Sequence, residues 1–282
     1  MEQLGCCEIR QMLLACADRI IRNEPYLTRV DSAIGDGDHG IGMKNGMQAA
    51  RRYLETAENE QNVYALYANM ASAMQAAMGG ASGMIFSTLF AGKAAEHAPA
   101  SAITPKELAE QMRDGLQAIQ ELGHAEVGDK TMVDALAPAV AAMLAHTDSF
   151  AEMFRAGAEA AHEGMERTKE YTARFGRAKS LGERAIGHAD AGATSTWLIL
   201  VEMQDYATGE YTPDPELPAE EHASQESTLP WKKKIINEPA NVVKEEAEGF
   251  LAAFGDQFAA VPDVNGLVKK EIPAGKTARV IG

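Results

Sequence analysis

The sequence Thr104-Pro105-Lys106-Glu107, followed by LAEQMRDGLQAIQELG up to Gly123, carries signals for both ends of a helix. Thr104 is a favourable cap, a proline fits the first turn, and Glu107 can close a capping box. Apolar residues then recur every three or four positions, and a glycine such as Gly123 commonly follows a helix. The stretch therefore predicts an amphipathic helix whose apolar face consists of Leu108, Met112, Leu116 and Ile119.

The same period continues through most of residues 1–208, where alternating β-branched runs are nearly absent. Further helices are predicted at Met84–Ala95, 131–146, 149–174 and 192–208. Two more apolar stripes lie in the first 20 residues and between residues 62 and 78. We interpret these stripes as core, and their members are Ile9, Leu13, Cys16, Ile20, Leu66, Met70, Met74 and Met78. The fold class predicted is all-α.

Composition excludes several classes of function. The chain has 282 residues, 26 Lys plus Arg and 41 Asp plus Glu, which gives a net charge of −15. So acidic a chain has no excess of cations to displace counterions from nucleic acid or to bind an anionic membrane surface. We therefore predict no nucleic-acid partner and no membrane partner.

The N-terminus and the cysteines indicate a cytoplasmic protein. Charged residues interrupt the first 20 positions, so they do not form a signal peptide. No apolar run reaches the roughly 18 residues that a membrane span needs. All three cysteines, Cys6, Cys7 and Cys16, lie in the first predicted helix, a pattern that favours reduced thiols over a disulfide framework.

The decapeptide Asp31-Ser-Ala-Ile-Gly-Asp36-Gly-Asp38-His39-Gly40 is the first candidate site. Its carboxylates suit Mg²⁺, and its glycines allow a tight turn. It also matches a dinucleotide-binding fingerprint by spacing, but that motif needs a preceding strand and this neighbourhood is helical. An EF-hand beginning at Asp36 would require a glutamate where Met47 stands. The remaining alternatives are a magnesium site and an acidic surface turn.

Three more glycine-rich connections precede predicted helices. Gly79–Gly83 suits a phosphate cradle at a helix N-terminus, or close helix packing. Gly128–Met132 favours a capped helix start, and the basic stretch Gly176–Thr194 favours a solvated loop, although its cations could also balance a nucleotide. If the helices run up and down around one axis, all four connections meet at one end. An acidic metal turn, an anion cradle and a basic loop together suit phosphoryl transfer.

Composition changes after Gly209. Residues 210–230 contain four prolines and several acids but no lysine or arginine, which predicts a linker. Residues 231–282 read as a further short unit with a helix and a possible final strand. The predicted domains are therefore 1–209, the linker 210–230 and the segment 231–282.

Taken together, the four motifs resemble the nucleotide-binding L subunit of dihydroxyacetone kinases over about residues 1–208. The matching signatures are Gly35–Gly40 with the preceding Asp31, Gly79–Gly83, Gly128–Met132, and Gly176-Arg-Ala with the later run Gly187–Ser195. The resemblance implies an eight-helix antiparallel barrel with a nucleotide, ATP or ADP, at one end. One departure is Ala191, where the family commonly has proline.

The resemblance also implies the residues of the site. Asp31, Asp36 and Asp38 would hold Mg²⁺ ions that bridge the phosphates, and Arg177 would be the catalytic cation at a phosphate. The nucleotide site would be lined by His39, Gly40, Ile41, Gly42, Ala81, Ser82, Gly123, Met132, Arg177, Asp190, Ala191 and Gly192.

In this family a K-type subunit holds the ketose, and residues 231–282 resemble the beginning of such a unit. The resemblance thus implies phosphoryl transfer to dihydroxyacetone or a related short ketose on a K-type partner. It leaves open whether ATP exchanges freely or a fixed ADP is recharged by a phosphotransferase-system protein. An alternative function is a nucleotide-binding regulatory module that docks to a partner protein without catalysis.

Overall fold

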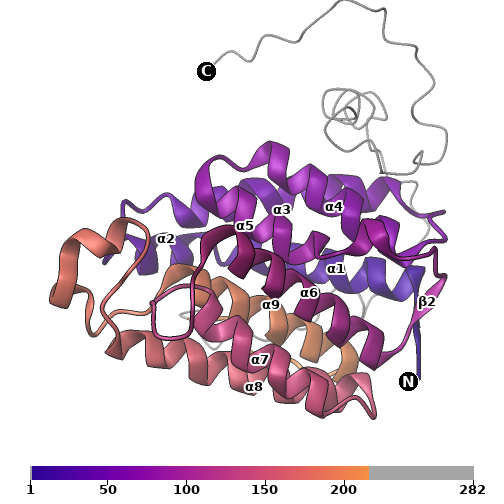
Figure 1. Cartoon of the computed structure of the whole chain (residues 1–282). Coiled ribbons are helices and arrows are strands. Elements are labelled where there is room, and N and C mark those ends of the chain that lie inside the picture. Colours follow the sequence, from indigo (N-terminus) through magenta and orange to yellow (C-terminus); the bar gives the residue numbers. More distant parts are fainter. Residues whose placement is uncertain (1, 216–282) are drawn as a thin grey trace, which may run out of the picture.

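The computed structural model describes residues 2–215, which form a helical barrel (Figure 1). Nine α-helices occur in this described part: α1 (Cys6–Arg22), α2 (Glu24–Ser32), α3 (His39–Thr56), α4 (Val63–Ala77), α5 (Gly80–Ala91), α6 (Pro105–Gly123), α7 (Val133–Ala145), α8 (Phe150–Arg167) and α9 (Ala191–Thr208). The short elements are β1 (Leu4–Gly5), β2 (Ala102–Ile103) and the 3₁₀ helices η1 (Ala94–Glu96), η2 (Thr168–Glu170) and η3 (Arg177–Ala185). β1 and β2 pair antiparallel.

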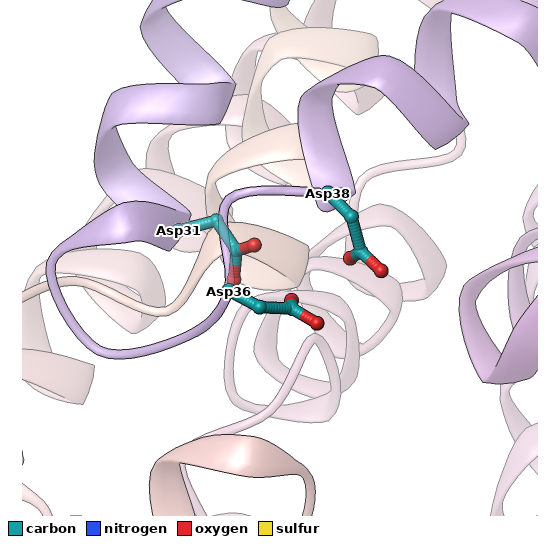
Figure 2. Close-up of side chains that lie close together, drawn as sticks. All are labelled: Asp31, Asp36 and Asp38. Carbon is teal, nitrogen blue, oxygen red and sulfur yellow. The ribbon is translucent and has the colours of Figure 1, made fainter.

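Eight of these helices close into a ring. Each of α3 to α8 packs against the next helix in sequence, α1 packs against α3, and α9 packs against α1. The short helix α2 stands outside this ring, packs against α3 and α9, and leads into α3 through the turn drawn in Figure 2. This arrangement confirms the predicted all-α, eight-helix barrel.

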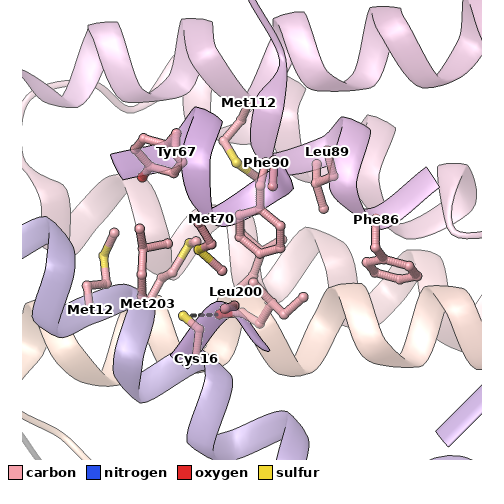
Figure 3. Packing of buried hydrophobic residues seen from close by; sticks show 14 of the residues in the cluster. Met12, Cys16, Tyr67, Met70, Phe86, Leu89, Phe90, Met112, Leu200 and Met203 are labelled. Atoms are coloured by element: carbon pink, nitrogen blue, oxygen red, sulfur yellow. Dashed lines mark hydrogen bonds between the residues drawn. The ribbon is translucent and has the colours of Figure 1, made fainter. Parts of the chain in front are cut away.

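The interior of the barrel is filled by apolar side chains (Figure 3). Every residue of the predicted stripes is buried, and Met12, Met70 and Met203 meet around Cys16 in the middle. The Cys16 thiol donates a hydrogen bond to the carbonyl of Ile199 at 3.7 Å. All three cysteines are free thiols, as predicted.

The helix α6 has the ends that its sequence predicts. The Glu107 backbone N–H donates to Thr104 Oγ1 at 3.3 Å, and the Thr104 backbone N–H donates to Glu107 Oε2 at 2.7 Å. This reciprocal pair is a capping box. The helix ends at Gly123, and His124 then adopts a left-handed conformation.

Two other predicted helices have different ends. α5 begins at Gly80 rather than Met84 and ends at Ala91, because Gly92 turns with φ of 45° where α6 lies close against it. α8 ends at Arg167, not at residue 174, because the carbonyl of Thr168 accepts a hydrogen bond from Lys130. The prediction missed both boundaries because each depends on a distant part of the chain.

A buried ion network fastens α1 to α9. Arg19, 1 % exposed, pairs with Glu202 and Asp205 of α9 and with Asp214, each at 3.1 Å. Its guanidinium also donates to the carbonyl of Thr212 at 2.9 Å. The first residues of the predicted linker are thus bonded to the helical domain. The rest of that linker and the segment 231–282 lie outside the described residues.

The helix α9 begins at a partly buried cap. Asp190 Oδ2 accepts a hydrogen bond from the Ala193 backbone N–H at 2.8 Å. Burial raises the pKa of the Asp190 carboxyl to about 7, and nearby acids add to the effect of burial. The start of α9 therefore contains a group that titrates near neutral pH.

Across residues 2–215 the helices are too short or too polar to cross a lipid bilayer.

We predict that Arg19→Ala lowers the free energy of unfolding by about 3–5 kcal/mol, because it leaves buried carboxylates without their cation. The measurement is urea denaturation. The matched control is Arg51→Ala, since Arg51 pairs with Asp18 and Glu55 near the surface and should contribute no more than about 1 kcal/mol. Equal losses in the two variants would contradict the assignment of Arg19 as the fastening residue.

We predict a pH-dependent effect of Asp190→Asn on stability. Between about pH 4 and 7 the native Asp190 holds a proton that the unfolded chain has lost, so its contribution to stability disappears as the pH rises through 7. Asparagine also caps helices but carries no charge. Relative to the native chain, the variant should gain roughly 1–2 kcal/mol between pH 5 and pH 8. A gap that stays constant between these two pH values in urea denaturation would refute the raised pKa.

Candidate functional site

Four helix N-termini meet at one end of the barrel. The turns that precede α3, α5, α7 and α9 all lie at this end, as the up-and-down order requires (Figure 1). These four turns are the four glycine-rich connections of the sequence. Helix N-termini carry partial positive charge and unbonded N–H groups, so this end favours anions.

Three carboxylates lie together between α2 and α3 (Figure 2). Asp31, Asp36 and Asp38 each place a carboxylate oxygen within 4.8 Å of the other two. Gly35 is required here, because a side chain at that position would overlap the Asp31 carboxylate. Gly37 has φ of 77°, a left-handed conformation that suits glycine. We call these three aspartates the acidic cluster.

The electrostatics of the acidic cluster suit a divalent cation. Burial, and then the neighbouring Asp36 and Asp31, raise the pKa of the Asp38 carboxyl. Arg177 forms an ion pair with Asp36 and offsets part of this repulsion. Oxygen ligands from several carboxylates are those that Mg²⁺ prefers, so the residues present fit a magnesium site.

His39 connects the start of α3 to the start of α9. Its backbone N–H donates to Asp31 Oδ2 at 3.3 Å, and its ring Nε2 lies 2.8 Å from Ser195 Oγ. Burial lowers the pKa of the ring to about 4, so the imidazole is neutral at neutral pH. His39 therefore orients the backbone beside the acidic cluster and contributes no charge there.

The residues after His39 fall on two sides of α3. Gly40 lies so close to Thr28 of α2 that a side chain there would overlap it. Ile41 is 51 % exposed, and the Cα of Gly42 faces open space. Of the predicted nucleotide-site residues in this turn, Ile41 and Gly42 are thus accessible, whereas His39 and Gly40 are buried.

The turn Gly79–Gly83 leads directly into α5. Gly79 and Gly80 face open space, Ala81 is exposed and Ser82 is partly exposed. Gly83 packs against Met78. Gly79 and Gly80 therefore suit a phosphate cradle, whereas Gly83 serves close packing. The helix joins the rest of the site through Phe86, whose ring centroid lies 5.9 Å from that of His39.

The third and fourth connections touch one another. A Cβ on Gly192 would lie 3.2 Å from the Cβ of Met132, which is buried. Gly123, the last residue of α6, faces open space and is partly buried. Asp134 accepts hydrogen bonds from the backbone N–H groups of Gly128 and Thr131 and so shapes the turn before α7.

Arg177 brings the fourth connection to the first. It is the first residue of η3, its side chain is 71 % exposed, and it reaches Asp36 across the end of the barrel. Asp190, Ala191 and Gly192 form the start of α9, and the Ala191 backbone also interacts with the His39 ring. The predicted site residues of these two connections therefore lie on one surface.

A cavity of about 260 Å³ lies between the start of α7 and the end of α8. Its lining includes Val127, Pro138, Arg167 and Tyr171, and it contains none of the predicted site residues. Asp134, which shapes the turn before α7, also lines this cavity, so the cavity adjoins that turn.

Sequence reasoning missed two residues that shape the site. Ser195 belongs to the fourth signature, but a serine inside a helix has no local signal for a histidine partner on another helix. Lys130 belongs to the motif Gly128–Met132, whose pattern favours a capped helix start. Its burial, 2 % exposed, depends on the packing of the α6–α7 connection against the α8–α9 connection and has no signature in the local sequence.

Comparison with known proteins agrees with this geometry. The DAK2 domain family matches residues 33–205. The ADP-binding subunit DhaL of a PEP-dependent dihydroxyacetone kinase from Listeria innocua is 37 % identical over 64 % of this chain and 85 % of its own length.

Two longer proteins match over about a third of their length. A D-erythrulose kinase from Mycolicibacterium smegmatis is 35 % identical over 69 % of this chain and 34 % of its own. The crystal structure of the dihydroxyacetone kinase from C. freundii with AMP-PNP and Mg²⁺ superposes with a TM-score of 0.57 at 25 % identity, over 70 % of this chain and 33 % of that one. The chain belongs to the DAK2 domain family, the nucleotide-binding L subunits of the dihydroxyacetone kinases, and is a kinase component.

Proposed function

We propose that the chain holds a magnesium nucleotide at the acidic cluster and passes a phosphoryl group to a short ketose on a K-type partner. The observation that carries this proposal is the acidic cluster itself, whose oxygens lie within 4.8 Å of one another where four helix N-termini converge. Bound Mg²⁺ would neutralise phosphate charge, which is the main requirement of phosphoryl transfer.

Each predicted site residue has a role in this proposal. Asp31, Asp36 and Asp38 hold the cation, and Arg177 meets the transferring phosphoryl group with a planar guanidinium that suits phosphate oxygens. The start of α5 supplies N–H groups to the phosphates. The remaining lining residues are His39, Gly40, Ile41, Gly42, Ala81, Ser82, Gly123, Met132, Asp190, Ala191 and Gly192.

Relatives support dihydroxyacetone or erythrulose as the acceptor. The L. innocua relative is a dihydroxyacetone kinase subunit, and the M. smegmatis relative is a D-erythrulose kinase. Both substrates are short ketoses with a terminal hydroxyl group beside the carbonyl. We place acceptor recognition on the K-type partner, since the site described here consists of carboxylates, helix N-termini and a cation that suit a nucleotide.

Relatives also bear on the phosphodonor. The L. innocua relative, matched over 85 % of its length, is an ADP-binding subunit of a PEP-dependent enzyme. A Lactococcus lactis relative is a subunit of a PTS-dependent enzyme. We therefore propose that ADP stays on the chain and is recharged by a phosphotransferase-system protein.

The division of the chain is part of the proposal. Residues 1–209 would be the L domain, 210–230 a linker, and 231–282 the beginning of a K-type unit. Support for the first boundary comes from α9, which closes the ring with α1 and ends at Thr208.

We predict that Asp31→Asn weakens Mg-ADP binding by about 30-fold or more, because removing one charge partner costs at least ~2 kcal/mol. Isothermal titration calorimetry with MgCl₂ and ADP measures the change. Asp148→Asn is the matched control, since Asp148 is an exposed acid between α7 and α8, at the other end of the barrel. Unchanged affinity in Asp31→Asn, with native helicity by circular dichroism, would rule out the metal site.

We predict that turnover requires phosphoenolpyruvate and phosphotransferase-system proteins in addition to a K-type subunit and ketose. The assay follows phosphorylated ketose with dihydroxyacetone and with erythrulose as acceptors. Comparable turnover with ATP alone would show free nucleotide exchange and overturn the proposed phosphodonor. No phosphorylated ketose with any donor would favour a regulatory module that binds nucleotide without catalysis.

A further inference from the structure

Lys130 is a buried cation that the proposed reaction does not use. It is 2 % exposed and lies in the turn between α6 and α7. Its φ of 60° is left-handed, a conformation that costs energy for a residue with a side chain. The backbone is thus strained at Lys130, the residue whose side chain is buried in this turn.

Both observed hydrogen bonds of the Lys130 ammonium go to backbone carbonyls of the connection between α8 and α9. Nζ donates to the carbonyl of Thr168 at 2.5 Å and to the carbonyl of His188 at 2.6 Å. The first acceptor lies just after α8 and the second just before α9. One side chain of the α6–α7 connection therefore joins both ends of the α8–α9 connection at the nucleotide end of the barrel.

These bonds close the base of a long excursion of the chain, residues 170–187. Beside Lys130, the Asp190 backbone N–H donates to Thr168 Oγ1 at 2.9 Å, and the Gly187 N–H donates to the Lys169 carbonyl at 2.7 Å. Thr168 is fully buried. The excursion carries η3, and with it the Arg177 that pairs with Asp36.

We propose that Lys130 is a positioning residue that fixes the base of the excursion 170–187 and thereby places Arg177 over the acidic cluster. The proposal rests on the function proposed above for Arg177. Lys130 itself touches neither nucleotide nor metal in this scheme, since its hydrogen bonds go to Thr168 and His188.

A cation suits this position for two reasons. Three N–H donors on one flexible stem can satisfy carbonyls from separate segments. In addition, Asp190 and Asp134 lie near enough to stabilise the charge, although burial lowers the pKa of the Lys130 ammonium. A neutral side chain would leave the His188 carbonyl without this donor, and the Thr168 carbonyl with only the Tyr171 backbone N–H at 3.2 Å.

The test compares Lys130→Met with native chain by amide hydrogen exchange in the absence of ligands. Faster exchange is expected in peptides that cover 170–190, with the rest of the barrel unchanged, because only the base of the excursion is loosened. The matched control is Lys169→Met, whose exposed ammonium pairs with Glu166 on the surface and should leave exchange unaltered.

Kinetics of the complete system give the second readout. Lys130→Met should slow phosphoryl transfer by on the order of 100-fold, because a misplaced Arg177 loses its alignment, while Mg-ADP affinity changes much less. The double variant Lys130→Met/Arg177→Ala should be no slower than Arg177→Ala alone, since Lys130 acts through Arg177. Lys169→Met should transfer at the native rate.

Several outcomes overturn the proposal: unchanged exchange in 170–190, faster exchange throughout the barrel, or rate losses that multiply in the double variant. If Lys130→Met does not fold, Lys130→Gln replaces it in the same cycle, because it removes the ammonium that joins the Thr168 and His188 carbonyls. If the native chain transfers no phosphoryl group at all, the proposed function fails, whereas the exchange data still decide whether Lys130 holds the excursion.

Discussion

Repulsion among three crowded carboxylates is the constraint around which this end of the barrel is built. Asp31, Asp36 and Asp38 lie within 4.8 Å of one another, and their proximity together with burial raises the pKa of Asp38. Positive charge close to such a cluster lowers the electrostatic cost of keeping all three groups ionised. Here four helix N-termini and Arg177 supply part of that positive charge. The carboxylate oxygens of the cluster are also suitable ligands for a divalent cation.

The up-and-down order of the helices determines what surrounds the cluster. Because α3, α5, α7 and α9 all run away from this end, their partial positive charges add at one surface. The ring of helices fixes this order. Arg19 closes the ring, because it pairs α1, the first helix, with α9, the last described helix. Burial of the Met-rich core and closure of the ring thus place four separate connections within reach of one ligand.

Much of this architecture can be read from local sequence. The capping box at Thr104 and the stop at Gly123 gave both ends of α6, and the apolar stripes identified the core. The clustered acids and glycines point to the first connection, whereas the site residues of the fourth connection follow from the family resemblance. The ion pair between Arg177 and Asp36 brings the two connections together.

Features that depend on distant contacts could not be predicted. The end of α8 at Arg167 is set by Lys130, which is 38 residues away from Thr168. The neutral state of His39 follows from its burial beside Ser195 of α9, and the start of α5 at Gly80 follows from an open turn. For the end of α8 and for His39 the deciding partner lies far away in the sequence, and no local pattern identifies it.

The most direct test is a crystal structure of the chain grown with MnCl₂ and ADP, with anomalous scattering used to locate the manganese. The account predicts anomalous peaks in contact with carboxylate oxygens of Asp31, Asp36 and Asp38, next to the phosphates of ADP. Bound ADP with those three side chains pointing into solvent, or manganese only at other acids, would contradict it.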